Sequence, residues 1–181
     1  MPVPAFPIAP VVETERLILR PHRPADHEAY ARLWADPVTV RFIGGRPFSR
    51  SESWGRILRQ IGHWRVQGFG FWALEEKASG ALVGEAGFHD LRRDVVPAFD
   101  GVPEAGWALA PGFHGRGLAR EAVEAIHSWG DRHLGTERCV CIIEPENHAS
   151  LRIARAIGYA DPVETTHAGT PILLLTRPVP R

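Results

Sequence analysis

Several features that would point to particular protein classes are missing from this sequence of 181 residues. The 21 Lys and Arg residues are balanced by 21 Asp and Glu residues, and a general nucleic-acid-binding surface needs a positive excess. The apolar runs are far shorter than the about 20 residues that cross a bilayer. The first ten residues, MPVPAFPIAP, hold four prolines and no Lys or Arg, so we interpret them as an extended arm rather than a secretory signal and expect a cytoplasmic protein.

Cysteine is also scarce, with only Cys139 and Cys141 present. On a strand, residues two apart have Cα atoms about 7 Å apart, which is too far for an easy disulfide. We expect two small buried residues of a reducing compartment, with Cys141 as a nucleophile the alternative. No CxxC or HExxH pattern occurs and the nine histidines form no metal-spaced cluster, so no metal site is expected.

The length suits one domain, because a chain of this size buries roughly 70% of its surface on folding without staples. Residues 90–101 are predicted to form an irregular, mobile loop. Hairpins dominate the middle of the pattern and strand–helix–strand units come late, which indicates a mixed α/β (α+β) fold, mainly antiparallel, and not a doubly wound sheet. Alternation and helical periodicity predict strands at 14–20, 69–75, 81–89, 104–110, 138–144, 159–164 and 170–177, and helices at 24–35, 51–66, 118–133 and 147–157.

The segment Pro111–Ala119 joins a predicted strand to a predicted helix and carries Gly115 and Gly117. Glycine permits close approach of the backbone, and the main-chain amides of residues 115–120 would point out of a helix N-terminus. Such a turn can bind a pyrophosphate, with Arg116 and Arg120 adding charge. By itself this is weak evidence. A Walker A loop is excluded, and the dinucleotide pattern GxGxxG fails at residue 120.

A second motif, from Glu144 to Tyr159, changes the interpretation. Together the two motifs resemble the GNAT acetyltransferase superfamily, most closely its ribosomal-protein N-terminal acetyltransferase-like (RimJ/RimL) branch. The matching pieces are Glu104-Ala105-Gly106-Trp107, Pro111 through Glu121-Ala122, Asn147 with Ser150, Gly158-Tyr159 and the opening Glu15–Arg20. The resemblance runs over a single domain, residues 12–177, after the arm of residues 1–11.

The resemblance implies a central sheet of about seven strands with helices on both faces and two splayed central strands. It implies acetyl-CoA as cosubstrate, no metal, and an amine acceptor that is a protein N-terminus or a small molecule. Pantetheine would pair with the backbone at Leu109 and Ala110. The remaining cofactor contacts would come from His114, Gly115, Arg116, Gly117, Leu118, Ala119, Arg120, Asn147 and Ser150.

The resemblance also assigns chemistry. Glu104 is the first candidate for the base that takes the proton of the amine, and Glu85 on the preceding strand is the second. Ser150 would assist departure of the thiolate. The sequence departs from the superfamily at Gly112, where Arg or Gln is common, and at Ala154, where many members carry a tyrosine acid.

Three functions remain open at this point: a direct N-acetyltransferase, a non-catalytic acyl-CoA sensor, and a ping-pong enzyme using Cys141. The acceptor pocket would lie across the sheet from the cofactor, and the protein would be a monomer or homodimer. The aromatic residues considered for the pocket lining are Trp34, Phe42, Trp54, Trp64 and Trp72, each of which could equally be core.

Overall fold

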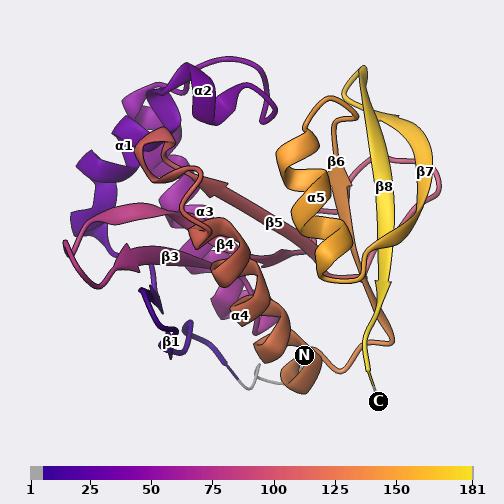
Figure 1. Cartoon of the computed structure of the whole chain (residues 1–181), viewed down its shortest axis with the longest axis horizontal. Helices are drawn as coiled ribbons and strands as arrows, with labels where there is room; N and C mark the ends of the chain where they lie inside the picture. The colour runs from indigo at the N-terminus through magenta and orange to yellow at the C-terminus, as the bar shows by residue number, and fades with distance from the viewer. Residues whose placement is uncertain (1–5, 181) are drawn as a thin grey trace.

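One sheet of eight strands forms the centre of the structure (Figure 1), a computed structural model that describes residues 6–180. Within residues 6–180 the strand order is β1-β2-β3-β4-β5-β6-β8-β7, and only the β5–β6 pair is parallel. The mixed, mainly antiparallel α/β fold is therefore confirmed. The strands are β1 (Val12–Glu13), β2 (Leu17–Arg20), β3 (Phe71–Glu76), β4 (Leu82–His89), β5 (Glu104–Leu109), β6 (Arg138–Ile143), β7 (Ala160–His167) and β8 (Thr170–Pro178).

Helices cover both faces of the sheet, as the side chains of β4 show. Glu85 contacts Tyr30 and Arg56 on one face, while Phe88 packs against His127 on the other. The first face holds α1 (His27–Ala35) and α3 (Arg50–Gln67), and the second holds α4 (Leu118–His133) and α5 (His148–Ala156). Two 3-10 turns, η1 (Pro24–Asp26) and η2 (Pro111–Phe113), precede α1 and α4.

Three local predictions need correction. The strand expected at 14–20 begins only at Leu17, because Thr14 closes a turn onto Leu17 and the extra strand β1 precedes it, which makes eight strands rather than about seven. The short helix α2 (Pro37–Val40) follows α1, capped by the Asp36 side chain. The loop at 90–101 is packed onto the sheet, with Val95 and Phe99 buried in one hydrophobic cluster.

The N-terminal arm can be followed only from Phe6, because residues 1–5 lie outside the described part of the chain. The Phe6 ring packs edge-on against Trp129 at 5.4 Å, and the carbonyl of Pro10 accepts a hydrogen bond of 2.7 Å from the Trp72 indole. This part of the arm is therefore attached to the domain. Over residues 6–180, no helix has the length and apolar character to cross a membrane.

A buried polar chain holds α4 to the sheet. His127, 2% exposed, has Nδ1 2.7 Å from the carbonyl of Val123 and Nε2 2.9 Å from the Tyr159 hydroxyl. A carbonyl only accepts, so Nδ1 carries the hydrogen and Nε2 accepts from Tyr159. Burial lowers the pKa of His127 to about 4, so the ring is neutral in the folded protein.

This arrangement predicts an acid-sensitive contribution to stability. Unfolded His127 has a pKa near about 6.5, so the unfolded state binds more protons between that value and about 4, and stability is lost as the pH falls through this window. In His127→Gln the free energy of unfolding should depend less steeply on pH between 7 and 4.5. Urea denaturation at several pH values measures this, with the exposed His148→Gln as control, and identical slopes for wild type and His127→Gln would contradict it.

Candidate functional site

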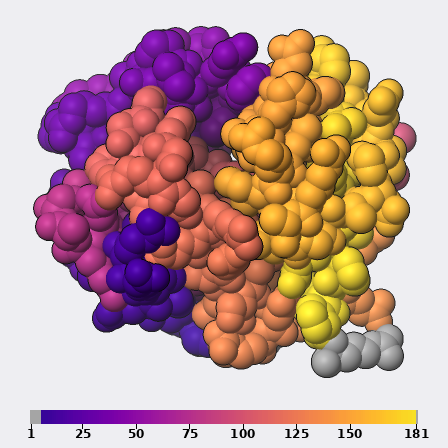
Figure 2. Space-filling model, in the orientation of Figure 1, coloured from indigo at the N-terminus to yellow at the C-terminus, as the bar shows by residue number. Residues whose placement is uncertain are grey.

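The site lies where the two central strands separate. Strands β5 and β6 pair in parallel only at Glu104 and Val140, and the register ends there. Beyond that pair the structure holds a cavity of about 390 Å³. Its walls come from α1, the 42–48 loop, α3, β4, β5, β6, the start of α5 and the β7–β8 turn. In Figure 2 the surface of the later part of the chain, orange to yellow, meets that of the earlier part, indigo to salmon, along one boundary.

The turn before α4 presents a row of open main-chain amides. Gly115 and Gly117 have positive φ angles of 72° and 78°, and Gly117 is the N-cap of α4. Within residues 6–180, none of the amides of residues 115–120 donates to a protein acceptor, whereas Glu121 N–H already bonds to the carbonyl of Gly117. Unpaired donors at a helix N-terminus form a site for an anion.

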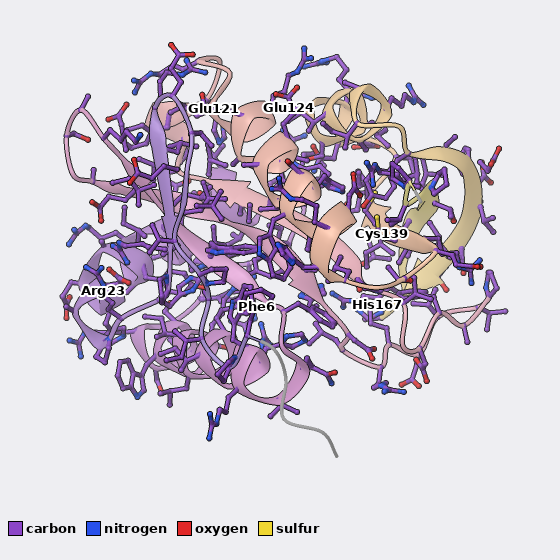
Figure 3. The ribbon with its side chains drawn as sticks, turned by 90° about the horizontal axis from the view of Figure 1, so that it is seen from below. Phe6, Arg23, Glu121, Glu124, Cys139 and His167 are labelled. Atoms are coloured by element: carbon purple, nitrogen blue, oxygen red, sulfur yellow. The ribbon has the colours of Figure 1, made fainter. Side chains whose placement is uncertain are left out.

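A clamp from the β1–β2 turn fixes this loop. The Arg16 guanidinium donates to the carboxylate of Glu121 at 2.7 Å and to the carbonyl of Arg116 at 2.7 Å. The Thr14 hydroxyl donates to the same carboxylate at 2.6 Å, and Figure 3 labels Glu121 near the start of α4. The sequence analysis identified this strand as part of the motif but missed the positioning role of Arg16 and Glu121.

The basic side chains of the loop are already paired. Arg116 forms an ion pair of 2.5 Å with Glu76, and Arg120 pairs with Glu124 at 2.8 Å. The Arg120–Glu124 pair is exposed, and such pairs contribute little, so Arg120 is free to exchange its partner for a phosphate. Glu76 is buried, so Arg116 is held more firmly. The ring of His114 lies with Nε2 2.8 Å from the carbonyl of Leu109, which ties the turn to the end of β5.

The main chain at the end of β5 is only partly open. Ala110 donates to the carbonyl of Val83 and its own carbonyl accepts from Phe113. Of the two residues expected to pair with pantetheine, Leu109 and Ala110, both main-chain groups of Ala110 are therefore in use, and the Leu109 carbonyl faces His114 Nε2. Alternation along the strand turns the main-chain groups of Trp107 and Leu109 toward the side where β6 has diverged. The open positions are therefore Trp107, which the sequence analysis did not select, and the N–H of Leu109.

Glu104 lies in the wall of the cavity, 3% exposed. Arg93 of the 90–103 loop donates to its carboxylate at 2.6 and 3.1 Å, and His89 Nε2 lies 3.0 Å away. Burial alone would raise the pKa of Glu104, but His89 and Arg93 lower it below its usual value. Glu104 is therefore ionised at neutral pH.

Glu85 occupies a different environment. Its carboxylate is completely buried and accepts hydrogen bonds from the Tyr30 hydroxyl at 2.5 Å, from Arg56 at 2.6 Å and from Gln60 at 3.3 Å. Burial would raise the pKa of Glu85, but Arg56 and the bonded neighbours hold it well below its usual range. With its oxygens saturated, Glu85 is suited to holding Arg56 rather than to taking a proton.

Asn147 and Ser150 both line the cavity. Asn147 caps α5 by accepting from the Ser150 amide at 3.2 Å, and within the described chain the Ser150 hydroxyl has no recorded partner. Ala154 is fully buried in the core. The two tyrosines of the sequence, Tyr30 and Tyr159, are both buried in the polar clusters described above, so neither can act as an acid at the cavity.

The cysteines are poor nucleophiles in this structure. Both are buried and free, and burial raises the pKa of the Cys141 thiol well above its usual value. Since the thiolate is the reactive form, this environment argues against a ping-pong route through Cys141. In the described part of the chain, no group of three or more His, Cys, Asp or Glu side chains could hold a metal ion.

The aromatic candidates divide into two sets. Trp34 and Phe42 line the cavity, whereas Trp54 lies 5.1 Å from the His27 ring. Trp64 and Trp72 pack edge-to-face at 4.7 Å in the main core and also contact Trp129, so they do not line the pocket. Five basic residues that line the cavity were not predicted from the sequence: Arg56, Arg59, His89, Arg93 and His167.

Comparison with known proteins places this geometry in a family. Residues 16–160 match the acetyltransferase (GNAT) domain family. A GNAT-family acetyltransferase from Bordetella pertussis is 35% identical, with a TM-score of 0.82 over 93% of this chain and 99% of that one. The uncharacterised N-acetyltransferase YoaA of Bacillus subtilis is 26% identical over 83% of this chain and 82% of its own.

The fold is also shared with RimL, a ribosomal-protein α-N-acetyltransferase solved in complex with coenzyme A. That structure is 15% identical, with a TM-score of 0.74 over 94% of this chain and 98% of its own. The resemblance expected from the two sequence motifs is confirmed by these matches. The chain belongs to the GNAT acetyltransferase family.

Proposed function

We propose that this protein transfers an acetyl group from acetyl-CoA to a primary amine by direct attack. The observation that carries the proposal is the row of unpaired amides at residues 115–120 beside the cavity between β5 and β6. A diphosphate fits these donors, because a helix N-terminus favours negative charge. Family membership and the coenzyme A complex of RimL support the same proposal.

Main-chain and side-chain groups of the chain would hold the cosubstrate along this path. Gly115 to Arg120 bind the diphosphate, and Asn147 lies beside the pantetheine arm. The open main-chain groups of Trp107 and Leu109 pair with the pantetheine amides, as an added strand would. When bound, acetyl-CoA supplies an activated acetyl thioester.

Glu104 then acts as the base. The amine arrives as an ammonium ion and must lose a proton before its nitrogen can attack, and the ionised Glu104 accepts that proton directly or through a water molecule. A main-chain N–H of β5 polarises the acetyl carbonyl. The Ser150 hydroxyl, which lines the cavity, donates to the departing sulfur.

The alternative is an acyl-CoA-binding sensor without catalysis, which the buried Ala154 and the absence of an available tyrosine favour. Titration calorimetry with acetyl-CoA and a thiol-release assay with a panel of amines and N-terminal peptides separate the two. Binding with turnover of at least one amine supports the enzyme. Tight binding with no turnover of any acceptor indicates the sensor.

The diphosphate assignment predicts a specific effect of Gly117→Ala. A Cβ at a φ of 78° costs about 1–2 kcal/mol, and it would lie 3.4 Å from the Arg16 guanidinium. The dissociation constant of acetyl-CoA should therefore rise roughly tenfold. Gly112→Ala is the control, because its Cβ meets nothing within 4 Å, and equal affinities in calorimetry for both variants would mean that the loop is wrongly assigned.

The base assignment predicts that Glu104→Gln lowers kcat by about 100-fold with little change in acetyl-CoA affinity. Because the pKa of Glu104 is lowered, the wild-type rate should stay level from neutral pH into the acidic range. The variant depends on the free-amine fraction, so its rate should rise about tenfold per pH unit. A pH–rate profile of the same shape in both proteins would rule out Glu104 as the base, and the exposed Glu146→Gln serves as control.

Glu85→Gln should act mainly on folding. The substitution leaves Arg56 buried without its carboxylate, and breaking such a pair destabilises a protein by about 3–5 kcal/mol. The exposed pair partner Glu124→Gln should change stability by less than about 0.5 kcal/mol. Chemical denaturation measures both, and a Glu85→Gln protein of wild-type stability that has lost only its kcat would restore Glu85 as a candidate base.

A further inference from the structure

The charges that line the cavity are mostly neutralised in pairs. Arg56 pairs with Glu85 at 2.6 Å, and Arg93 pairs with Glu104 at 2.6 Å. His167, labelled in Figure 3, accepts a hydrogen bond of 2.8 Å from Arg93 at Nε2. These groups therefore form two separate networks. Arg56 and Glu85 form one beside α1 and α3, and Arg93, Glu104 and His167 form the other at the start of β5.

Arg59 is the exception on the α3 wall. It lies one helical turn after Arg56 and lines the cavity. Within residues 6–180 its guanidinium takes part in no recorded hydrogen bond or ion pair. Arg59 is exposed on α3, and partial removal from water and the charge of Arg56 lower its pKa against the opposing attraction of Glu85.

A second open donor lies beside it. Arg56 donates to Glu85 through Nε and Nη2, while no bond is recorded from Nη1. The guanidinium is stacked on the Trp34 ring, 3.9 Å from its centroid, which fixes its plane. The α3 wall thus offers one guanidinium outside any direct ion pair, Arg59, and a rigid neighbouring donor, Arg56, an arrangement suited to binding a carboxylate.

The opposite wall carries the complementary charge. Glu144, at the end of β6, lines the same cavity, and its side chain has no recorded partner in the described chain. Glu144 lines the cavity together with Asn147 and Ser150, the residues assigned to the cosubstrate. Glu104, which is ionised, lines the same cavity. The positive and negative open groups therefore come from different walls of one cavity.

Much of the remaining lining of the cavity is apolar. It includes Phe42, Ile43, Phe48 and Leu91 together with Trp34. A zwitterion with an apolar side chain matches this surface: its ammonium faces the carboxylates, its carboxylate faces α3 and its side chain lies against the aromatic rings. A polyamine would instead bring a second positive charge toward Arg59.

We infer that the acceptor is a free α-amino acid with an apolar side chain, held by its carboxylate at Arg59 with Arg56 beside it. This inference rests on the proposed acetyl transfer and names the substrate class of that same site. Arg59 is here a specificity-determining residue: it binds the part of the acceptor that does not react and so places the amine toward the carboxylates.

The test compares matched acceptors in the thiol-release assay: L-phenylalanine, L-phenylalaninamide and 2-phenylethylamine, with spermidine and an N-terminal peptide. L-Phenylalaninamide is the stringent comparison for the role of the carboxylate. Its amine loses a proton more readily than that of L-phenylalanine, so a lower rate with the amide cannot come from a less available amine. We expect kcat/KM for L-phenylalanine to exceed that for either analogue by at least about tenfold. A preference for spermidine, the peptide or a decarboxylated amine would overturn the inference.

Arg59→Gln should raise the KM for L-phenylalanine by about 10- to 100-fold and leave the analogues unchanged, while Arg59→Lys recovers part of the loss. Arg65→Gln, an exposed position of the same helix, is the control. Equal losses for acid and analogues, or a loss of acetyl-CoA affinity in Arg59→Gln, would overturn the role of Arg59. Acetyl-CoA binding with no amino acid turned over contradicts this inference alone, whereas absent acetyl-CoA binding contradicts the proposed function as well.

Discussion

The site depends on one interrupted strand pairing. Among the described strands, β5 and β6 are the only parallel neighbours, and they share a single registered pair, Glu104 with Val140. Beyond that pair each strand keeps unpaired main-chain groups, and the space between them becomes the cavity. The helices α4 and α5 follow the carboxyl ends of β5 and β6, and the main-chain amides before α4 remain open.

Two buried carboxylates on one face of the sheet, Glu85 and Glu104, have different partners. Glu85 and Glu104 both have a lowered pKa, but for Glu85 the bonded partners close around every side. Glu104 is held by Arg93 and His89 in the wall of the cavity, next to the diverging strands. The first arrangement holds the guanidinium plane of Arg56, and the second keeps Glu104 ionised in the cavity wall, as the proposed base requires.

Local sequence patterns predicted most of the fold and part of the candidate site. Alternation identified every long strand, and the positive φ of Gly115 and Gly117 agrees with the loop inferred from glycine spacing. The short elements were not predicted, because β1 has two residues and α2 depends on the side-chain cap of Asp36, which precedes Pro37. Contacts between distant segments could not be predicted from local patterns: Arg16 donates a hydrogen bond to Glu121, 105 positions further along the chain. The same limit hid Arg59 and Arg93, since a lone arginine on a helix or in a loop has no signature until the fold gives it neighbours.

The central claim is that the amides before α4 bind the diphosphate of acetyl-CoA and direct the thioester between β5 and β6. Amide chemical-shift mapping on the uniformly ¹⁵N-labelled protein tests it most directly. On addition of acetyl-CoA, the largest changes should fall on residues 115–120, with a second group at Trp107 and Leu109. Shifts confined to another surface, or none at saturating concentration, would contradict the account.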